Sequence, residues 1–177
     1  KGGDLIIVAR SKDKLNELKK ELEQKHKINV FVISKDLTQP NSAKEIYEKV
    51  QNEGIKVDYL INNAGFGDYG EFVQTNWEKE NQMIQLNIVA LTQLTKLFLP
   101  DMIARKSGNV MNVASIASSL PGPLMSIYCA SKAFVLHFSE AINNEVKGHN
   151  VSVTALCPGP TLSGFQDAAN LGESKFF

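Results

Sequence analysis

The sequence predicts an α/β protein with a doubly wound parallel sheet and helices on both faces. Two observations carry this prediction. Short, continuous apolar runs, typical of strands covered on both faces, alternate along the chain with segments in which apolar residues recur at helical spacing. The glycines and prolines lie at the ends of these segments. Such an alternation implies right-handed crossovers between parallel strands, so ligands are expected beyond the carboxyl ends of the strands.

The first part of the chain supplies two strand and helix pairs. Residues 4–9 form an apolar run that predicts a buried strand, and Ser11 is a suitable cap for the amphipathic helix that follows it. Residues 29–33 predict the next strand. Ser42 and Glu45 have the spacing of a capping box, so a second helix is expected to start there.

The rest of the chain continues the alternation. Residues 57–62 predict a third strand, and Thr75 with Glu78 predicts a second capping box at the start of a long helix that runs to about Pro100 or a little beyond. The last expected elements are a strand at 109–113, a helix at about 127–146 with Gly148 as its C′ residue, and a strand at 151–157.

Composition limits the possible functions. A chain of 177 residues with 43% hydrophobic residues can bury one substantial core, so we expect a single domain over residues 1–177. Its 19 basic and 19 acidic residues cancel, which provides no basic field for nucleic acid. No run approaches the roughly 18 apolar residues of a membrane span. We therefore expect a cytoplasmic protein with no nucleic-acid partner.

Cysteines and histidines give no sign of a metal site. Cys129 and Cys157 are too few for a disulfide framework and lack metal-ligand spacing, which fits a reducing compartment. His26, His137 and His149 form no ligand pattern. No metal is expected.

Candidate catalytic residues gather at the carboxyl end of the fourth strand. Tyr128 and Lys132 lie four residues apart at the start of a helix, on one face, and Ser115 follows the strand. Lowering a phenol pKa by three units needs about 4 kcal/mol, and an ammonium about 4 Å away supplies roughly that amount. Tyr128 would then be a usable acid or base, and Ser115 could stabilise an oxyanion. The alternatives are a half-buried tyrosine beside a solvated lysine, and a serine that caps a loop.

Four segments, in order, carry a family resemblance: Asn62-Asn63-Ala64-Gly65, Ser115, Tyr128-Cys129-Ala130-Ser131-Lys132 and Pro158-Gly159. The chain resembles the short-chain dehydrogenase/reductase family, nicotinamide-dependent oxidoreductases of Rossmann type. The resemblance implies that Tyr128 is the general acid or base and that Lys132 tunes it and holds the nicotinamide ribose. It also implies that Ser115 orients the substrate. Asn87, in the long helix, would support a proton-relay water.

The resemblance also implies where the cofactor binds. The adenosine half would contact the segment after the third strand and a pair after the second strand, where the aspartate could instead be a helix cap. The nicotinamide would contact the loop after the last strand. The implied residues are Asn63, Ala64, Gly65, Asp36, Leu37, Pro158, Gly159, Thr161 and Ser163.

The end of the first strand bears on the choice of cofactor. An acidic residue there would bind the ribose 2′-hydroxyl of NAD, whereas this chain has Arg10, whose guanidinium can hold a 2′-phosphate. The alternative is an exposed basic residue with no ligand. NADP(H) is therefore expected in preference to NAD(H).

The sequence departs from the family pattern at both ends. It contains neither the opening strand with its Gly-rich phosphate turn nor, beyond Phe177, the last strand. We expect the chain to be the ordered part of a longer polypeptide rather than a true fragment.

The leading functional hypothesis is an NADP-dependent oxidoreductase that interconverts a carbonyl and a secondary alcohol by hydride transfer. The alternatives are a non-catalytic nucleotide-sensing or scaffold protein on the same fold, and an isomerase or dehydratase of the same family. The family also implies a homodimer or homotetramer paired through the long helices.

Overall fold

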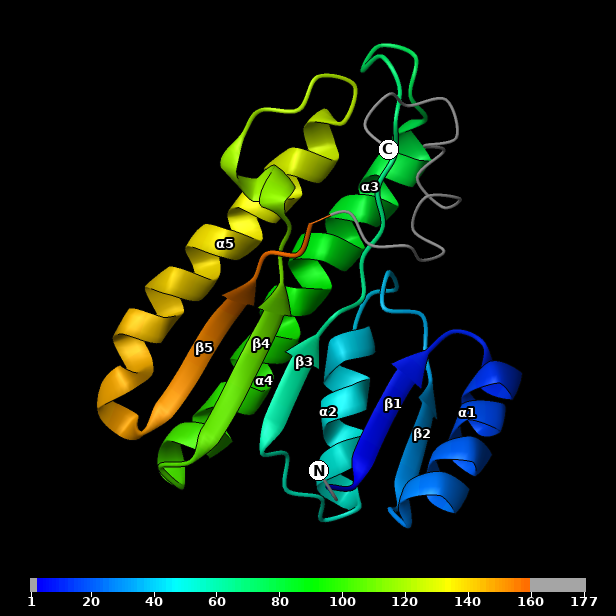
Figure 1. Cartoon of the computed structure of the whole chain (residues 1–177), viewed down its shortest axis with the longest axis vertical. Helices are drawn as coiled ribbons and strands as arrows, with labels where there is room; N and C mark the ends of the chain where they lie inside the picture. The colour runs from blue at the N-terminus through cyan, green and yellow to red at the C-terminus, as the bar shows by residue number, and fades with distance from the viewer. Residues whose placement is uncertain (1–2, 160–177) are drawn as a thin grey trace.

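Five parallel strands form the framework of the computed structural model, which describes residues 3–159 (Figure 1). One sheet pairs β1 (Leu5–Ala9) with β2 (Val30–Ser34), and the other has the order β3 (Tyr59–Asn62), β4 (Gly108–Val113), β5 (Val151–Leu156). Every pairing is parallel, as the sequence predicts. Among residues 3–159, no strand is hydrogen-bonded between β1 and β3.

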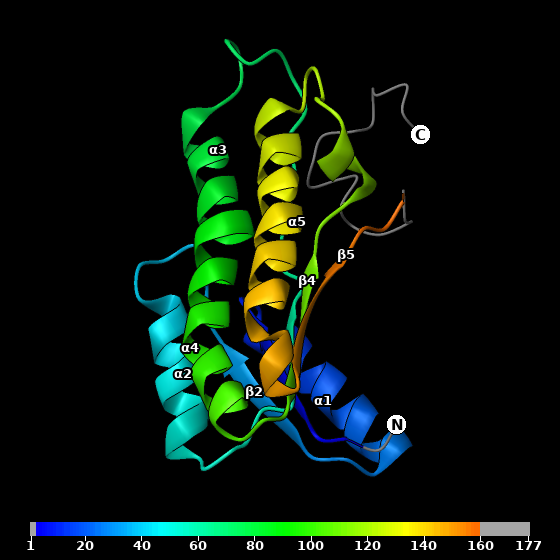
Figure 2. The ribbon, with the colours of Figure 1, turned by 90° about the vertical axis from the view of Figure 1, so that its left-hand side faces the viewer.

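Helices cover both faces of these strands. The long helices are α1 (Lys12–His26), α2 (Ser42–Asn52), α3 (Trp77–Ile84), α4 (Leu91–Ala104) and α5 (Ser126–Val146). In Figure 2, α1 lies on the opposite side of the strands from α2, α4 and α5. The expected doubly wound arrangement is therefore confirmed. Within residues 3–159 no helix combines the length and the hydropathy that a membrane crossing requires.

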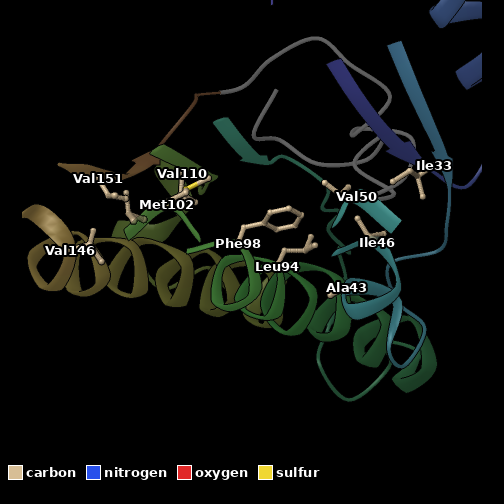
Figure 3. Packing of buried hydrophobic residues seen from close by; sticks show 11 residues of the cluster. Ile33, Ala43, Ile46, Val50, Leu94, Phe98, Met102, Val110, Val146 and Val151 are labelled. Atoms are coloured by element: carbon tan, nitrogen blue, oxygen red, sulfur yellow. The ribbon is translucent and has the colours of Figure 1, made fainter. Parts of the chain in front are cut away.

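The main core lies between the strands and helices α2, α4 and α5. The burial of β4 alternates along the strand, so Val110 and Asn112 point into the protein, while Met111 and Val113 are partly exposed on the other face. The residues that fill this core, most of them labelled in Figure 3, are Ile33, Ala43, Ile46, Val50, Leu94, Phe98, Met102, Val110, Val146, Val151 and Val153.

The predicted capping box at Ser42 is wrong, because the N-cap of α2 lies one residue earlier. Asn41 is the N-cap of α2, in the left-handed conformation with a φ of 64°. Ser42 is already helical, and its hydroxyl donates to the carbonyl of Leu37 at 3.2 Å. Glu45 forms an ion pair with Lys35 instead of capping the helix. A left-handed asparagine reverses the chain without a side-chain cap, which the capping pattern does not anticipate.

The second predicted capping box is also displaced. Asn76 caps α3, and its side chain accepts a hydrogen bond from the backbone N–H of Lys79 at 3.0 Å. The hydroxyl of Thr75 instead lies 2.7 Å from a carboxylate oxygen of Glu80, a buried residue. Asparagine is as good a cap as threonine, so the cap falls one residue later than the pattern predicts.

The end of the last helix differs in a similar way. Gly148 lies inside a short 3₁₀ turn, Lys147–His149, and is not the residue that reverses the chain. That residue is Asn150, with a φ of 56°. Asparagine tolerates the left-handed region, and the 3₁₀ turn carries the chain two residues further before it reverses.

The long helix predicted to run to about Pro100 or a little beyond consists of three consecutive segments. A π-helical stretch, Gln85–Ala90, joins α3 to α4, and α4 continues past Pro100 to Ala104. Proline in a helix interior costs one backbone hydrogen bond. Burial of Phe98 and Met102 on either side of it stabilises the helix enough to continue.

Candidate active site

Three side chains predicted from the sequence meet at the carboxyl end of β4. Ser115 follows β4, and Tyr128 and Lys132 lie in the first two turns of α5. All three are buried, with exposed fractions of 9%, 8% and 6%. The ammonium of Lys132 donates to the carbonyl of Val113 at 2.7 Å and lies 5.9 Å from the centre of the Tyr128 ring. A hydrogen bond joins the side chains of Ser115 and Tyr128.

Asn87 ties this group to the loop after β3. It lies in the π-helical stretch and is 1% exposed. Its side-chain oxygen accepts from the backbone N–H of Phe66 at 3.2 Å, and its nitrogen donates to the Phe66 carbonyl and to the Ser131 hydroxyl, each at 3.0 Å. Ser131 in turn donates to the carbonyl of Tyr128 at 2.7 Å. Asn87 thus connects the loop after β3 to the start of α5.

Burial dominates the ionisation of both titratable residues. Burial lowers the pKa of Lys132 to about 8. Burial also raises the pKa of Tyr128. The hydrogen bond from Ser115 lowers this pKa, and the nearby Cys129 raises it further. The pKa of Tyr128 therefore lies above its usual value, opposite to the direction expected beside an ammonium, because removal of the phenolate from water has the largest effect.

The segment after β3 passes close to two side chains of this group. Asn63, Ala64 and Gly65 are exposed where β3 ends. A side chain at Gly65 would meet the oxygen of Asn87 at 3.0 Å and the nitrogen of Lys132 at 3.4 Å. Glycine therefore leaves room for the backbone to pass beside both side chains, and the exposed strip next to them suits a nucleotide.

Residues at the other sheet are more loosely connected to the site. Arg10 is exposed at the end of β1, and its carbonyl accepts from the Ser34 hydroxyl at 3.0 Å. The carboxylate of Asp36 accepts from the backbone N–H and the hydroxyl of Thr38, at 3.0 and 2.8 Å. The Thr38 backbone hydrogen bond is the main cause of the lowered pKa of Asp36, and Arg10 contributes. Leu37 packs against the main core. Asp36 thus stabilises a turn before α2, and the N-cap of that helix is Asn41 rather than Asp36.

The loop after β5 lies beside Ser115. The carbonyl of Pro158 accepts from the backbone N–H of Ile116 at 3.1 Å, and Gly159 is exposed next to it. Thr161 and Ser163 lie outside the described residues. Residues 3–159 contain no group of three or more His, Cys, Asp or Glu side chains placed to hold a metal ion.

Sequence reasoning missed Ser131 and the carbonyl of Val113 as parts of the site. Ser131 lies between Tyr128 and Lys132 in the family motif, so its position is a signal that the sequence contains, whereas its contact with Asn87 is not. The Val113 carbonyl carries no residue-specific signal, because any residue at the end of β4 would supply it.

Fold and site together define a Rossmann-type α/β protein with a buried Ser-Tyr-Lys group at the carboxyl edge of the sheet. A family model of short chain dehydrogenases matches residues 1–174. The chain belongs to the short-chain dehydrogenase/reductase family.

Individual relatives agree with this assignment. The very-long-chain 3-oxoacyl-CoA reductase of Homo sapiens is 32% identical over 163 residues, covering 89% of this chain and 51% of that protein. The chain thus spans about half the length of the curated relatives it matches. A short-chain dehydrogenase from Sphingobium yanoikuyae in complex with NADPH is similar, with a TM-score of 0.89 at 34% identity over 94% of this chain and 65% of that one. L-Sorbose reductase from Gluconobacter frateurii, complexed with NADPH and L-sorbose, has a TM-score of 0.84 at 28% identity over 97% of this chain and 66% of that one.

Proposed function

We propose that the protein is an NADP-dependent oxidoreductase that interconverts a carbonyl and a secondary alcohol, with Tyr128 as the general acid or base. The observation that carries this proposal is the buried cluster in which Ser115 is hydrogen-bonded to Tyr128 beside Lys132. The human relative is named as a 3-oxoacyl-CoA reductase, and both similar solved structures contain NADPH. These names support the same class of reaction.

Ionisation of Tyr128 suits the reductive direction. Its raised pKa keeps the phenol protonated at neutral pH, so it holds a proton that a substrate oxygen can take. Ser115 donates a hydrogen bond to the same oxygen as negative charge develops on it. When bound, the cofactor supplies the hydride. Lys132, below its pKa of about 8, holds the positive charge that favours the phenolate left behind.

Binding of the cofactor involves several segments of the chain. Lys132 holds the nicotinamide ribose, and Asn87 keeps the Phe66 backbone and α5 in place around a relay water. The segments proposed to contact the rest of the cofactor comprise Asn63, Ala64 and Gly65, then Asp36 and Leu37, and finally Pro158, Gly159, Thr161 and Ser163.

Arg10 is proposed to favour NADPH over NADH by binding the 2′-phosphate. In the intact protein, Arg10→Glu should weaken NADPH binding by about 10- to 100-fold, because a charge-assisted hydrogen bond contributes about 1.5–3 kcal/mol. NADH binding should change far less. Lys20→Glu, which makes the same charge change on exposed α1, is the control. Fluorescence titration of the reduced nicotinamide measures both constants, and equal losses for the two cofactors would contradict this role.

A carbonyl screen tests the proposed reaction. The intact protein is supplied with NADPH and a panel of ketones, aldehydes and 3-oxoacyl thioesters, and loss of NADPH absorbance is followed with mass analysis of the alcohol formed. We expect stoichiometric oxidation of NADPH with at least one carbonyl. Binding of NADPH without turnover would favour the nucleotide-sensing alternative. A substrate that is rearranged or dehydrated with no net NADPH loss would favour the isomerase or dehydratase.

We also propose a location in the cell and an oligomeric state. We place the protein in the cytoplasm, which is supported by the two free cysteines, Cys129 and Cys157. A homodimer or homotetramer through α4 and α5 is proposed from the family, and a monomer by light scattering would contradict it.

A further inference from the structure

Two loops beside the candidate active site expose an unusual amount of apolar surface. Of the twelve large hydrophobic side chains that are exposed among residues 3–159, half lie in two segments, residues 72–77 and 116–124. Their exposed fractions range from 38% for Leu124 to 86% for Val73. Exposed apolar side chains that gather in one place commonly mark a binding surface. The six residues are Phe72, Val73, Trp77, Ile116, Leu120 and Leu124, called the apolar rim below.

A hydrogen bond joins the loop between β3 and α3, which holds most of the first segment, to the loop between β4 and α5, which holds the second. The backbone N–H of Gly70 donates to the carbonyl of Leu124 at 2.9 Å. Leu124 has a φ of 66°, a conformation that costs about 1 kcal/mol or more for leucine and that the surrounding contacts must offset. Lys79 fixes the first loop to α3 through an ion pair with buried Asp68 at 2.6 Å. Both loops lie at the same end of the molecule in Figure 1. The apolar rim is therefore an ordered part of the fold.

The rim is continuous with the candidate catalytic residues. Its second segment, 116–124, lies in the chain between Ser115 and Tyr128. Phe66 and Ala117, one from each loop, pack against the cluster that contains Tyr128. A carbonyl compound bound at Tyr128 would therefore lie beside both loops.

Charge is absent from one side of this surface. The sequence has no Asp, Glu, Lys, Arg or His between Lys106 and Lys132. A carboxylate or a row of hydroxyl groups that displaced water from this loop would find few partners for its hydrogen bonds, which is costly. An alkyl chain or hydrocarbon ring would instead gain the free energy of burial against Ile116, Leu120 and Leu124.

We propose that the apolar rim receives the hydrocarbon substituent of the substrate, so that the preferred substrates are carbonyl compounds with a long alkyl chain or an apolar ring. This inference rests on the proposed function and narrows it. Small hydroxy acids and polyhydroxylated ketones are poor substrates on this account.

Chain length and one charge substitution test the proposal. In the intact protein with NADPH, kcat/KM is measured for 2-butanone, 2-decanone and a ketohexose. Burial of two methylene groups already corresponds to about a tenfold gain, so 2-decanone should exceed 2-butanone by about tenfold or more. Leu120→Asp should reduce this ratio several-fold. Leu18→Asp, on α1, is the matched control, because Leu18 is also an exposed leucine and lies outside both loops; it should leave the ratio unaltered.

The possible results distinguish a failure of this inference from a failure of the proposed oxidoreductase function. Turnover of all three ketones with similar kcat/KM, or a ratio that Leu120→Asp leaves unaffected, overturns the inference while the oxidoreductase function stands. If the sole effect of Leu120→Asp is a change of molecular mass by light scattering, the inference is overturned in favour of contact with a second copy. If the sole effect is loss of binding to phosphatidylcholine vesicles, it is overturned in favour of a lipid surface. If no carbonyl is reduced, the proposed function fails. The affinity of 2-decanone for the wild type and for Leu120→Asp, measured by calorimetry, then tests the inference without turnover. Equal affinities overturn it.

Discussion

Lys132 is the residue whose burial has the clearest energetic consequence. Its side chain is 6% exposed, and its ammonium donates a hydrogen bond to the Val113 carbonyl at 2.7 Å. An ammonium in such a place is costly unless it is well solvated by the protein, and its pKa falls from 10.5 to about 8. The protein therefore bears this cost below pH 8 in order to hold a cation beside Tyr128.

The pH dependence of stability should reveal this cost. Between pH 8 and 10.5 the folded state binds fewer protons at Lys132 than the unfolded state, so the free energy of unfolding should rise with pH. The full gain is on the order of 3 kcal/mol. Urea unfolding of the wild type and of Lys132→Met across this window measures it, since Tyr128 is present in both. Parallel pH profiles for the two proteins would contradict the buried ammonium.

Gly122 offers a second prediction for a single residue. A Cβ at this position would overlap Sγ of Cys129, a buried thiol whose pKa is raised by burial. Gly122→Ala should therefore lower the free energy of unfolding by about 1–3 kcal/mol through overpacking. Adding Cys129→Ala removes the overlapping sulfur and should recover more than half of the loss in a double-mutant cycle. Additive effects would mean that the two residues do not compete for space.

A buried polar network links the elements that carry the site. Asn62 at the end of β3 donates to Asn112 of β4 at 2.8 Å and to Thr95 of α4 at 3.1 Å. Asn112 donates to Ser139 of α5 at 3.0 Å. These four side chains are at most 6% exposed, and each finds a partner. Such a network fixes the relative positions of two strands and two helices below the catalytic end.

Removal of its central member should be costly. Asn112→Leu keeps the side-chain volume but leaves Asn62 and Ser139 each with one partner fewer, so we expect a loss of about 2–4 kcal/mol. Asn144→Leu, on the exposed side of α5, should cost below about 0.5 kcal/mol. Urea unfolding compares the two variants. A loss at Asn112 no larger than that at Asn144 would show that the network does not stabilise the fold.

Strands and helix ends differ in how well the sequence predicts them. The strands were predicted within about two residues, because apolar runs such as Leu5–Ala9 reflect burial directly. Caps at Ser42 and Thr75 were each misplaced by one residue, since Asn41 and Asn76 compete for the same role. The π-helical stretch was not predicted, because the apolar periodicity of the sequence does not distinguish it from the α-helices on either side.

For the whole molecule, the sequence predicted which residues meet at the site better than it predicted the direction of their pKa shifts. The order of motifs on parallel strands brings Ser115, Tyr128 and Lys132 to one sheet edge, and the structure confirms that convergence. Burial of the phenol reversed the expected direction of its pKa, since desolvation is a property of the packed fold. The apolar rim likewise depends on two loops, distant in sequence, that Gly70 and Leu124 join.

Tyr128→Phe tests the central claim most directly. The change removes one hydroxyl, and Tyr47→Phe, which removes the hydroxyl that donates to Asp101 at 3.0 Å on α4, is its control. In the intact protein, kcat/KM for the best ketone should fall by about 10²- to 10⁴-fold in Tyr128→Phe, with NADPH binding retained, and should be unaffected in Tyr47→Phe. Turnover in Tyr128→Phe within about twofold of the wild type would contradict Tyr128 as the proton donor.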